Sequence, residues 1–325
     1  MELLTGIFVT PFLDIAAMPD LFFQGLWDGF VAGILYSLIA LGFVLIFKAS
    51  GVFNFAQPIM VVFSALTLVS LYELTHGAVG QIAGAVFAVI GTLVIMYLLA
   101  FSVERFILRK LVNQDPNILF MSTIGLTFVI IGGAQWIFGG VPRVMITEEL
   151  GLPTGSSALE IFDGAVYFEH LDIAAAVIAG TLILGLALFF SRTRIGRALR
   201  AVADDHQAAL SVGISLNQIW VIVWVAAGLV ALVTGIMWGA RSDVSFALQI
   251  VGMKALPVLI LGGFTSVPGA IVGGLIIGLG EKTFELYWGP LLGSGVEAWF
   301  AYIIALIFLL FRPQGLFGDK IIERV

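Results

Sequence analysis

The sequence predicts an all-α fold: a polytopic bundle of about eight or nine transmembrane helices, with a short amphipathic helix on its cytoplasmic side. Hydrophobic residues make up 60% of the 325-residue chain and charged residues only 11%, whereas soluble domains carry about 25% charged residues. The hydrophobic residues form continuous runs of roughly 20, the length that crosses about 30 Å of hydrocarbon. Because these runs do not alternate with polar residues, they favour helices over the strands of a membrane barrel.

The expected spans follow one another along the chain. Residues 1–24 form an N-terminal extension that Pro11 and Pro19 interrupt, so we expect no full span there. Spans are expected at about 27–47, 58–72, 79–101, 118–138, 173–190, 219–240, 244–263, 267–286 and 296–311. The chain then crosses nine times, or an even number of times if the 244–263 run is re-entrant or the extension crosses. Without a linker-like stretch, residues 1–325 are expected to form a single transmembrane domain.

The distribution of charge predicts the orientation. Most Lys and Arg residues lie at Lys48, 105–110, 192–200 and 312–324, and the expected spans bring these clusters to one side. The 139–172 loop on the other side is acidic, with Arg143 as its one Lys or Arg residue. Since short loops rich in Lys and Arg face the cytoplasm, we expect an external N-terminus, an external 139–172 loop and a cytoplasmic C-terminus.

Residues 191–217 form a polar segment between two strongly apolar runs. Within it, the spacing of Ile195, Leu199, Val202 and Leu210 predicts a helix with one apolar face. Such a helix is too short to span the bilayer, but it can lie at the surface and offer that face to a partner. Two interpretations are open: an ordinary cytoplasmic loop, or a coupling loop through which a soluble motor moves the neighbouring helices.

A few ionisable residues interrupt the apolar runs, and each needs a partner, water or an interface. Glu281 and Glu285 share a helix face, and Lys282 is spaced to pair with Glu285; an interfacial position for all three is the alternative. Lys254 stands in a strongly apolar run. We expect its side chain to reach the outer surface or to pair with a partner subunit.

Gly, Pro and amide residues mark further candidate positions. Gly262-Gly263 and Pro268-Gly269 are candidates for a helix interruption that lines a cavity, while most other glycines are expected to allow close helix packing. Asn54 and Gln57, at the start of the second span, are candidates for helix capping, for hydrogen bonds between helices, or for lining a translocation path.

Enzyme motifs are missing from the sequence. There is no cysteine, which excludes disulfides and cysteine-ligated metals. The chain has no G-x-x-x-x-G-K-[ST], G-x-S-x-G or H-E-x-x-H motif, and its three histidines are isolated. We therefore expect no catalytic residue, no metal site and no bound cofactor.

Four stretches carry a resemblance to a known family: NFAQ at 54–57, RTRIGRALRA at 192–201, MKALPVLILGGFTSVPGA at 253–270 and FRPQGLFG at 311–318. The chain resembles the inner-membrane permeases of ATP-binding-cassette (ABC) importers for branched-chain amino acids, the LivH/LivM group. In addition, Gln207-Ala208-Ala209 with Gly213 resembles the E-A-A-x-x-x-G signature of importer permeases, with Gln in place of Glu. The family usually has Gly where Pro58 stands, which is a departure from the pattern.

The resemblance implies a permease subunit that does not hydrolyse ATP itself. It implies two cytoplasmic ABC ATPases carrying ATP and Mg²⁺, a periplasmic solute-binding protein and a second permease chain, similar or identical, in the bacterial inner membrane with its lipid; no nucleic acid is involved. The ATPase would contact Arg194, Ile195, Gly196, Arg197, Leu199, Arg200, Asp204, Gln207, Ala208, Ala209 and Gly213. The translocation path or a helix break would involve Asn54, Gln57, Lys254, Gly262 and Gly263.

Two alternatives stay open at this point. Related permeases for urea, other amides or small acids share the resemblance, so the solute is not fixed. An ion-coupled secondary transporter would instead use Glu281, Glu285 or Lys254 as coupling groups.

Overall fold

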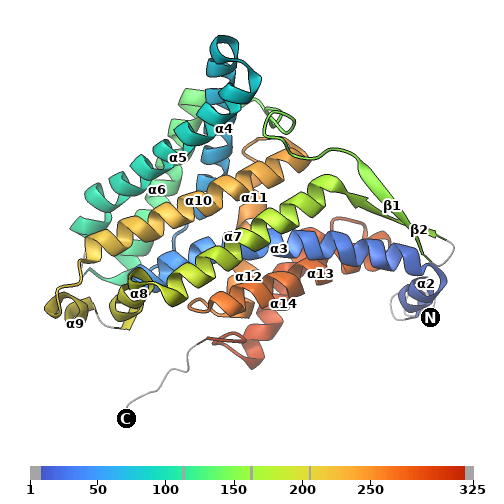
Figure 1. Cartoon of the computed structure of the whole chain (residues 1–325). Helices are drawn as coiled ribbons and strands as arrows, with labels where there is room; N and C mark the ends of the chain where they lie inside the picture. Colours follow the sequence, from blue (N-terminus) through green and yellow to red (C-terminus); the bar gives the residue numbers. More distant parts are fainter. Residues whose placement is uncertain (1–8, 112–113, 162–163, 205, 319–325) are drawn as a thin grey trace. The chain divides into compact units, whose positions relative to one another are not determined.

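The computed structural model describes residues 9–111, 114–161, 164–204 and 206–318, and most of them are helical (Figure 1). In chain order the elements are α2 (Thr10–Ala17), α3 (Pro19–Ser50), α4 (Gln57–Val79), α5 (Gln81–Phe106), η1 (Leu108–Lys110), α6 (Pro116–Phe138), β1 (Ser156–Ile161), β2 (Gly164–Glu169), α7 (His170–Arg192), α8 (Arg194–Asp204), α9 (His206–Ser211), α10 (Leu216–Ser242), α11 (Leu248–Met253), α12 (Ala255–Gly262), α13 (Val267–Leu292) and α14 (Glu297–Phe311).

Seven helices among the described residues are long and apolar enough to cross a membrane: α3, α4, α5 extended through η1, α6, α7, α10 and α13. The predicted polytopic helical fold is confirmed, and the chain is a multi-pass membrane protein. The count is lower than nine for a local reason. The 244–263 run forms two short helices, α11 and α12, that meet at Lys254, and α14 has only 15 residues.

The first span begins earlier than predicted. Pro19 was expected to interrupt the extension, but it is the first residue of α3, a helix of 32 residues. Proline is well suited to that position, because the N–H that it lacks would have no partner in the first helical turn. The short helix α2 precedes it and packs on α13, where the Phe12 and Trp288 rings meet edge to face at 5.9 Å.

Part of the expected 139–172 loop is a β-hairpin. β1 and β2 pair antiparallel from Ser156 opposite Glu169 to Ile161 opposite Gly164. The hairpin is attached to α3 at two points: the Tyr167 N–H donates to Gln24 Oε1 over 2.7 Å, and the Phe168 and Trp27 rings lie 5.0 Å apart. These strands within the loop were not predicted from the sequence.

The chain divides into two compact units, each built from separate segments. One unit holds the residues up to Ala40, Pro153–Ile178 and the chain from Lys254 onward. In it α12, α13 and α14 pack together, and α3 meets α13 through glycines. A Cβ atom on Gly29 would lie 2.8 Å from the Gly278 carbonyl oxygen, so the two backbones touch. This is the close packing that small residues allow in membranes.

The other unit holds Leu41–Leu152 and Ala179–Met253. Its centre is the three-helix arrangement of α4, α5 and α10, which Figure 1 shows side by side. α6 and α11 pack on α4, and the short helices α8 and α9 pack on α10. The polar segment is thereby attached to a helix of the unit's core.

Candidate functional site

The polar segment between α7 and α10 folds into α8 and α9. α8 turns back sharply over the end of α7, and Gly196 makes this corner possible, since a Cβ atom there would collide with the Phe190 carbonyl group. Thr193 Oγ1 accepts the Gly196 N–H over 3.2 Å, and Arg200 Nη1 donates to the Phe190 carbonyl over 2.9 Å. Arg200 thus satisfies a carbonyl at the C-terminus of α7, where a positive charge is favourable.

The apolar face of α8 lies against the protein. Leu199 is 2% exposed and Val202 is fully buried, and α8 packs on α10. The prediction that this whole stripe would be offered to a partner is wrong for these two residues. The spacing showed which face is apolar, but not that the chain itself would cover it.

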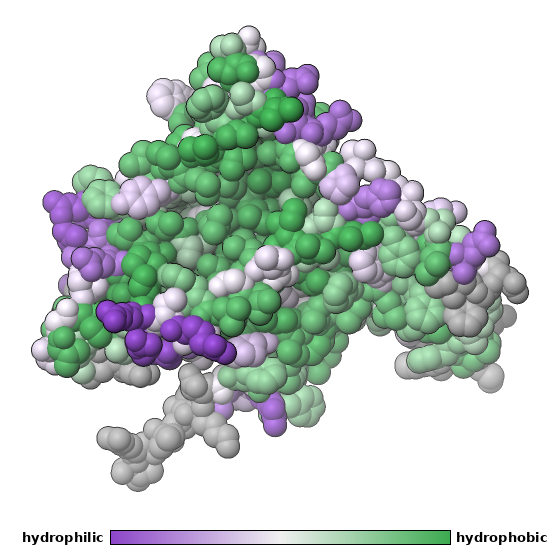
Figure 2. All heavy atoms as spheres, viewed as in Figure 1, coloured by the Kyte–Doolittle hydropathy of each residue, from purple (hydrophilic) through white to green (hydrophobic). Residues whose placement is uncertain are grey.

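The outward surface of the segment has a different composition. Arg194, Arg197, Gln207 and Ala208 are exposed, and so are Leu210 (51%) and Val212 (74%). Figure 2 shows hydrophilic side chains gathered over α8. Ile195 is half-buried and Ala209 is buried; the Asp204 side chain lies outside the described part. We call the four residues Arg194, Arg197, Leu210 and Val212 the outer coupling surface.

Gly213 ends this surface and turns the chain into α10. Its φ of +82° lies in the left-handed region, which glycine adopts without strain. Its N–H donates to the Leu210 carbonyl, and the Ile214 N–H donates to the Ala209 carbonyl, both over 3.0 Å. Three residues after Gly213, α10 begins at Leu216, so α9 and α10 are joined by a short, defined turn.

The two amides before the second span are buried. Asn54 Oδ1 accepts the Ala56 N–H over 3.1 Å at the entrance to α4. Gln57 Nε2 donates to the Ala227 carbonyl of α10 over 3.2 Å. Both residues are fully buried, and Gly42 of α3 leaves the room that Gln57 occupies. Asn54 therefore holds the backbone that leads into α4, and Gln57 joins α4 to α10 by a hydrogen bond.

Pro58, where the family usually has Gly, is accommodated in the first turn of α4. There its missing N–H costs no helical bond. It packs on α11 at Gly252, where an added Cβ atom would lie 2.8 Å from the proline Cβ. A glycine in α11 therefore leaves space for the ring of a proline in α4.

The predicted helix interruption lies between α12 and α13. α12 ends at Gly262, Gly263 has a φ of +100°, and α13 begins at Val267. Ser266 Oγ accepts the Gly269 N–H over 3.0 Å and caps α13. Gly262 and Gly269 face each other so closely that neither position has room for a Cβ atom.

The tail after α14 closes this interruption. The Leu316 N–H donates to the Leu261 carbonyl over 2.8 Å, and the Phe317 N–H donates to the Gly262 carbonyl over 3.1 Å. These are carbonyls at the end of α12, which has no further turn to satisfy them. Sequence reasoning singled out both stretches separately and missed their pairing. The glycines in each, Gly263 and Gly315, are the signal that two backbones approach closely.

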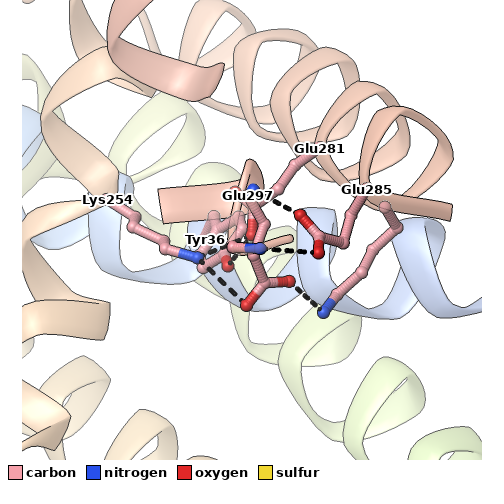
Figure 3. A network of polar contacts seen from close by, with 7 residues as sticks. Tyr36, Lys254, Glu281, Glu285 and Glu297 are labelled. Carbon is pink, nitrogen blue, oxygen red and sulfur yellow. Dashed lines mark hydrogen bonds and ion pairs between the residues drawn. The ribbon is translucent and has the colours of Figure 1, made fainter. Parts of the chain in front are cut away.

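A buried ionic cluster lies in the same unit (Figure 3). Lys254 Nζ is 2.6 Å from Glu281 Oε1, and Tyr36 Oη donates to the same oxygen over 3.0 Å. The Glu281 side chain is fully buried and that of Lys254 is 12% exposed. The predictions that Lys254 would reach the outer surface or pair with a partner subunit were wrong, because its partner is α13 of the same chain. Tyr36 was not anticipated at all.

The remaining charges of α13 pair with α14. Lys282 Nζ lies 2.6 Å from Glu297 Oε2, so the predicted pair with Glu285 was wrong. Glu285 instead accepts the backbone N–H groups of Gly295 and Glu297, both over 2.9 Å. A carboxylate is favourable at this N-terminal end of α14. Among the described residues no group of three His, Asp or Glu side chains could hold a metal ion.

Comparisons with known proteins agree with this architecture. A family model described as "Branched-chain amino acid transport system / permease component" matches residues 25–312. The permease protein BraD of Pseudomonas aeruginosa is 27% identical, over 95% of this chain and all of that protein. LivH of Escherichia coli is 26% identical, over 94% of this chain and 98% of that protein. Both are named permeases of high-affinity branched-chain amino acid transport systems. A probable LivH of Methanocaldococcus jannaschii is 25% identical, over 86% and 88% of the two chains.

Proposed function

We propose a function from one premise: this chain belongs to the family of permease components of branched-chain amino acid transport systems. It is a transmembrane permease subunit of an ATP-driven importer. We assign branched-chain amino acids to it as solutes, because relatives aligned over nearly its whole length carry that specificity in their names. The chain itself binds no cofactor in this proposal, and ATP and Mg²⁺ bind to the partner ATPases.

The assembly in this proposal has three further kinds of component. Two cytoplasmic ATPases supply the motion, a solute-binding protein delivers the amino acid from outside, and a second permease chain completes the path. The orientation is the one that the Lys and Arg clusters predict, with α8, α9 and the C-terminus in the cytoplasm and the β1–β2 hairpin outside.

The observation that carries the coupling role is the outer coupling surface. Arg194 and Arg197 are exposed on α8, and next to them in sequence α9 and its exit expose the apolar side chains of Leu210 and Val212. An apolar pair beside exposed guanidinium groups is suited to a partner groove with an acidic rim. Because α8 and α9 pack on α10, a movement of this surface reaches a core helix directly.

The ionic cluster favours this proposal over an ion-coupled secondary transporter. An ion-coupled secondary transporter needs a carboxylate or amine that can exchange its ion. Lys254 and Glu281 are instead bound to each other, and Glu285 is engaged by two backbone N–H groups. We likewise assign Asn54 and Gln57 to holding α4 in place, since both are buried and hydrogen-bonded.

The test uses the complex of the permease with its ATPases. Leu210→Glu combined with Val212→Glu, and separately Arg194→Glu combined with Arg197→Glu, should reduce co-purification of the ATPases at least about ten-fold, because losing an interface anchor typically costs roughly 2 kcal/mol or more. The amount of permease in the membrane should not change. Glu160→Arg, a charge change on the exposed strand β1, is the control. Normal ATPase capture by both double variants would refute the assignment.

A further inference from the structure

A buried carboxylate stands at the end of α5 where the chain reaches the predicted cytoplasmic side. The Glu104 side chain is 1% exposed, and its Oε1 lies 3.1 Å from Nε of Arg109, which η1 presents just beyond α5. The Arg109 side chain is 38% exposed. An unpaired carboxylate in this position would be strongly unfavourable, so the guanidinium is held where it neutralises Glu104.

Asn217 joins this pair from the first turn of α10. With its amide oxygen directed at the guanidinium, Asn217 Oδ1 accepts from Arg109 Nε (3.2 Å) and Nη2 (3.0 Å), and Nδ2 donates to Glu104 Oε1 (3.2 Å). The opposite orientation would set oxygen against oxygen and nitrogen against nitrogen. The three side chains therefore form one closed network between the ends of α5 and α10.

The position of Asn217 in the chain connects this network to the coupling segment. It lies four residues after Gly213, the turn that ends the outer coupling surface. A left-handed glycine followed by a free helix end would absorb a displacement of α9 by local unwinding. Bonds from the first turn of α10 to the Glu104–Arg109 pair oppose that unwinding, because separating the helices would break the hydrogen bonds that Asn217 makes to both charged groups.

We propose that Glu104, Arg109 and Asn217 are positioning residues that make α5 and α10 move together when the coupling segment moves. The inference rests on the proposed function of that segment, and it adds the element that receives the motion. The role is a transmitting one: none of the three belongs to the outer coupling surface.

A second bond to the same helix provides a matched control. Trp220 Nε1 donates to the Ala49 carbonyl at the end of α3 over 3.0 Å. This bond also joins the start of α10 to a neighbouring helix, but it involves neither a charged group nor α5. Trp220→Phe removes that hydrogen bond and retains an aromatic ring. It therefore measures the effect of losing an uncharged bond between α10 and a neighbouring helix.

The experiment uses the whole reconstituted importer with its ATPases and its solute-binding protein. Glu104→Gln, Asn217→Ala and their combination are compared with Trp220→Phe for ATPase capture, for basal ATP hydrolysis and for solute taken up per ATP hydrolysed. We expect normal capture, basal hydrolysis within about two-fold of the parent, and uptake per ATP lowered about ten-fold, within the range typical of coupling between sites. The combined variant should be no worse than either single one, since the residues act as a unit.

The outcomes separate this inference from the proposed function. Uptake per ATP equal to that of the parent in Glu104→Gln and Asn217→Ala overturns the inference, and so does an equal loss in Trp220→Phe. Loss of ATPase capture in these variants also overturns it, because the network would then shape the docking surface. If Glu104→Gln does not fold, Glu104→Met with Arg109→Met removes both charges and is measured in its place. Failure of the outer coupling surface variants to reduce capture would instead refute the proposed function.

Discussion

Lys254 at the start of α12 lies 2.6 Å from Glu281 in the middle of α13, and Glu281 is fully buried. Two charges that the sequence presents as isolated within separate apolar runs thus neutralise each other. The Tyr36 hydroxyl completes the coordination of the Glu281 Oε1 atom from α3. The pair joins the interrupted helix region to the long span that follows it.

Breaking this pair from one side should be costly. Lys254→Met leaves Glu281 buried without its counter-ion, and we expect the free energy of unfolding to fall by about 3–5 kcal/mol. Lys254→Met with Glu281→Met removes both charges and should recover most of that loss. Thermal unfolding of the purified chain in detergent measures both. The control is Lys282→Met at the half-exposed pair with Glu297, where both side chains are about one-third exposed; a cost there equal to that of Lys254→Met would contradict the account.

The contact between α3 and α13 depends on glycine. In Gly29→Ala the new Cβ atom would lie 2.8 Å from the backbone of Gly278 and Leu279. To relieve this contact, the backbone of α3 or α13 would have to shift. We expect a loss of about 1–3 kcal/mol, the usual cost of overpacking. Gly132→Ala in α6 is the control, because a Cβ atom there has nothing within 4 Å. It should be neutral or slightly stabilising, as alanine is the better helix former. Equal melting temperatures for the two variants would rule out the close contact.

Arg143 fastens the segment after α6 to three places. Its guanidinium donates to Ser70 Oγ (2.7 Å), to Glu73 (2.8 Å) and to the Phe138 carbonyl (2.8 Å). Its backbone also pairs with that of Val244. Arg143→Met should cost about 2 kcal/mol, as hydrogen bonds to charged groups contribute about 1.5–3 kcal/mol. It should also speed exchange of the backbone amides at position 143 and at Val244. Glu73→Gln should cost less than about 1 kcal/mol because the Glu73 side chain is 55% exposed. The reverse order of effects would count against this arrangement.

The hydrogen bonds between the tail after α14 and the end of α12 depend on Gly315. Its φ is +81°, and a Cβ atom would lie 2.6 Å from the Gly263 nitrogen. Gly315→Ala should therefore combine backbone strain of about 1–2 kcal/mol with a collision that pushes the tail off the end of α12. Gly51→Ala shares the positive φ, at +69°, but has open space around it, so it isolates the strain. Proteolysis of the tail should accelerate in Gly315→Ala only. Equal protection in both variants would show that the tail does not hold the interruption.

Much of the architecture could be predicted from the sequence because the membrane imposes it. An apolar run of about 20 residues has few stable alternatives to a helix, and the seven long helices lie where such runs occur. The family resemblance was likewise visible in short stretches and is confirmed by the match over residues 25–312.

The contacts could not be predicted in the same way. Periodicity identified the apolar face of α8, but whether Leu199 and Val202 meet a partner or their own chain depends on how the chain folds back at Gly196. Lys254 and Glu281 are 27 residues apart, and no local pattern pairs them. The β1–β2 hairpin was missed because its two six-residue strands give a much weaker signal than a span.

The most direct measurement of the central claim is uptake of a labelled branched-chain amino acid into vesicles that contain the purified permease. With its ATPases, its binding protein and ATP present, and with the ion gradients collapsed, the vesicles should accumulate the amino acid. With the permease alone and an ion gradient imposed, they should not. Accumulation against its gradient by the permease alone would contradict the account, because the chain would then draw energy from an ion gradient and not from a separate motor.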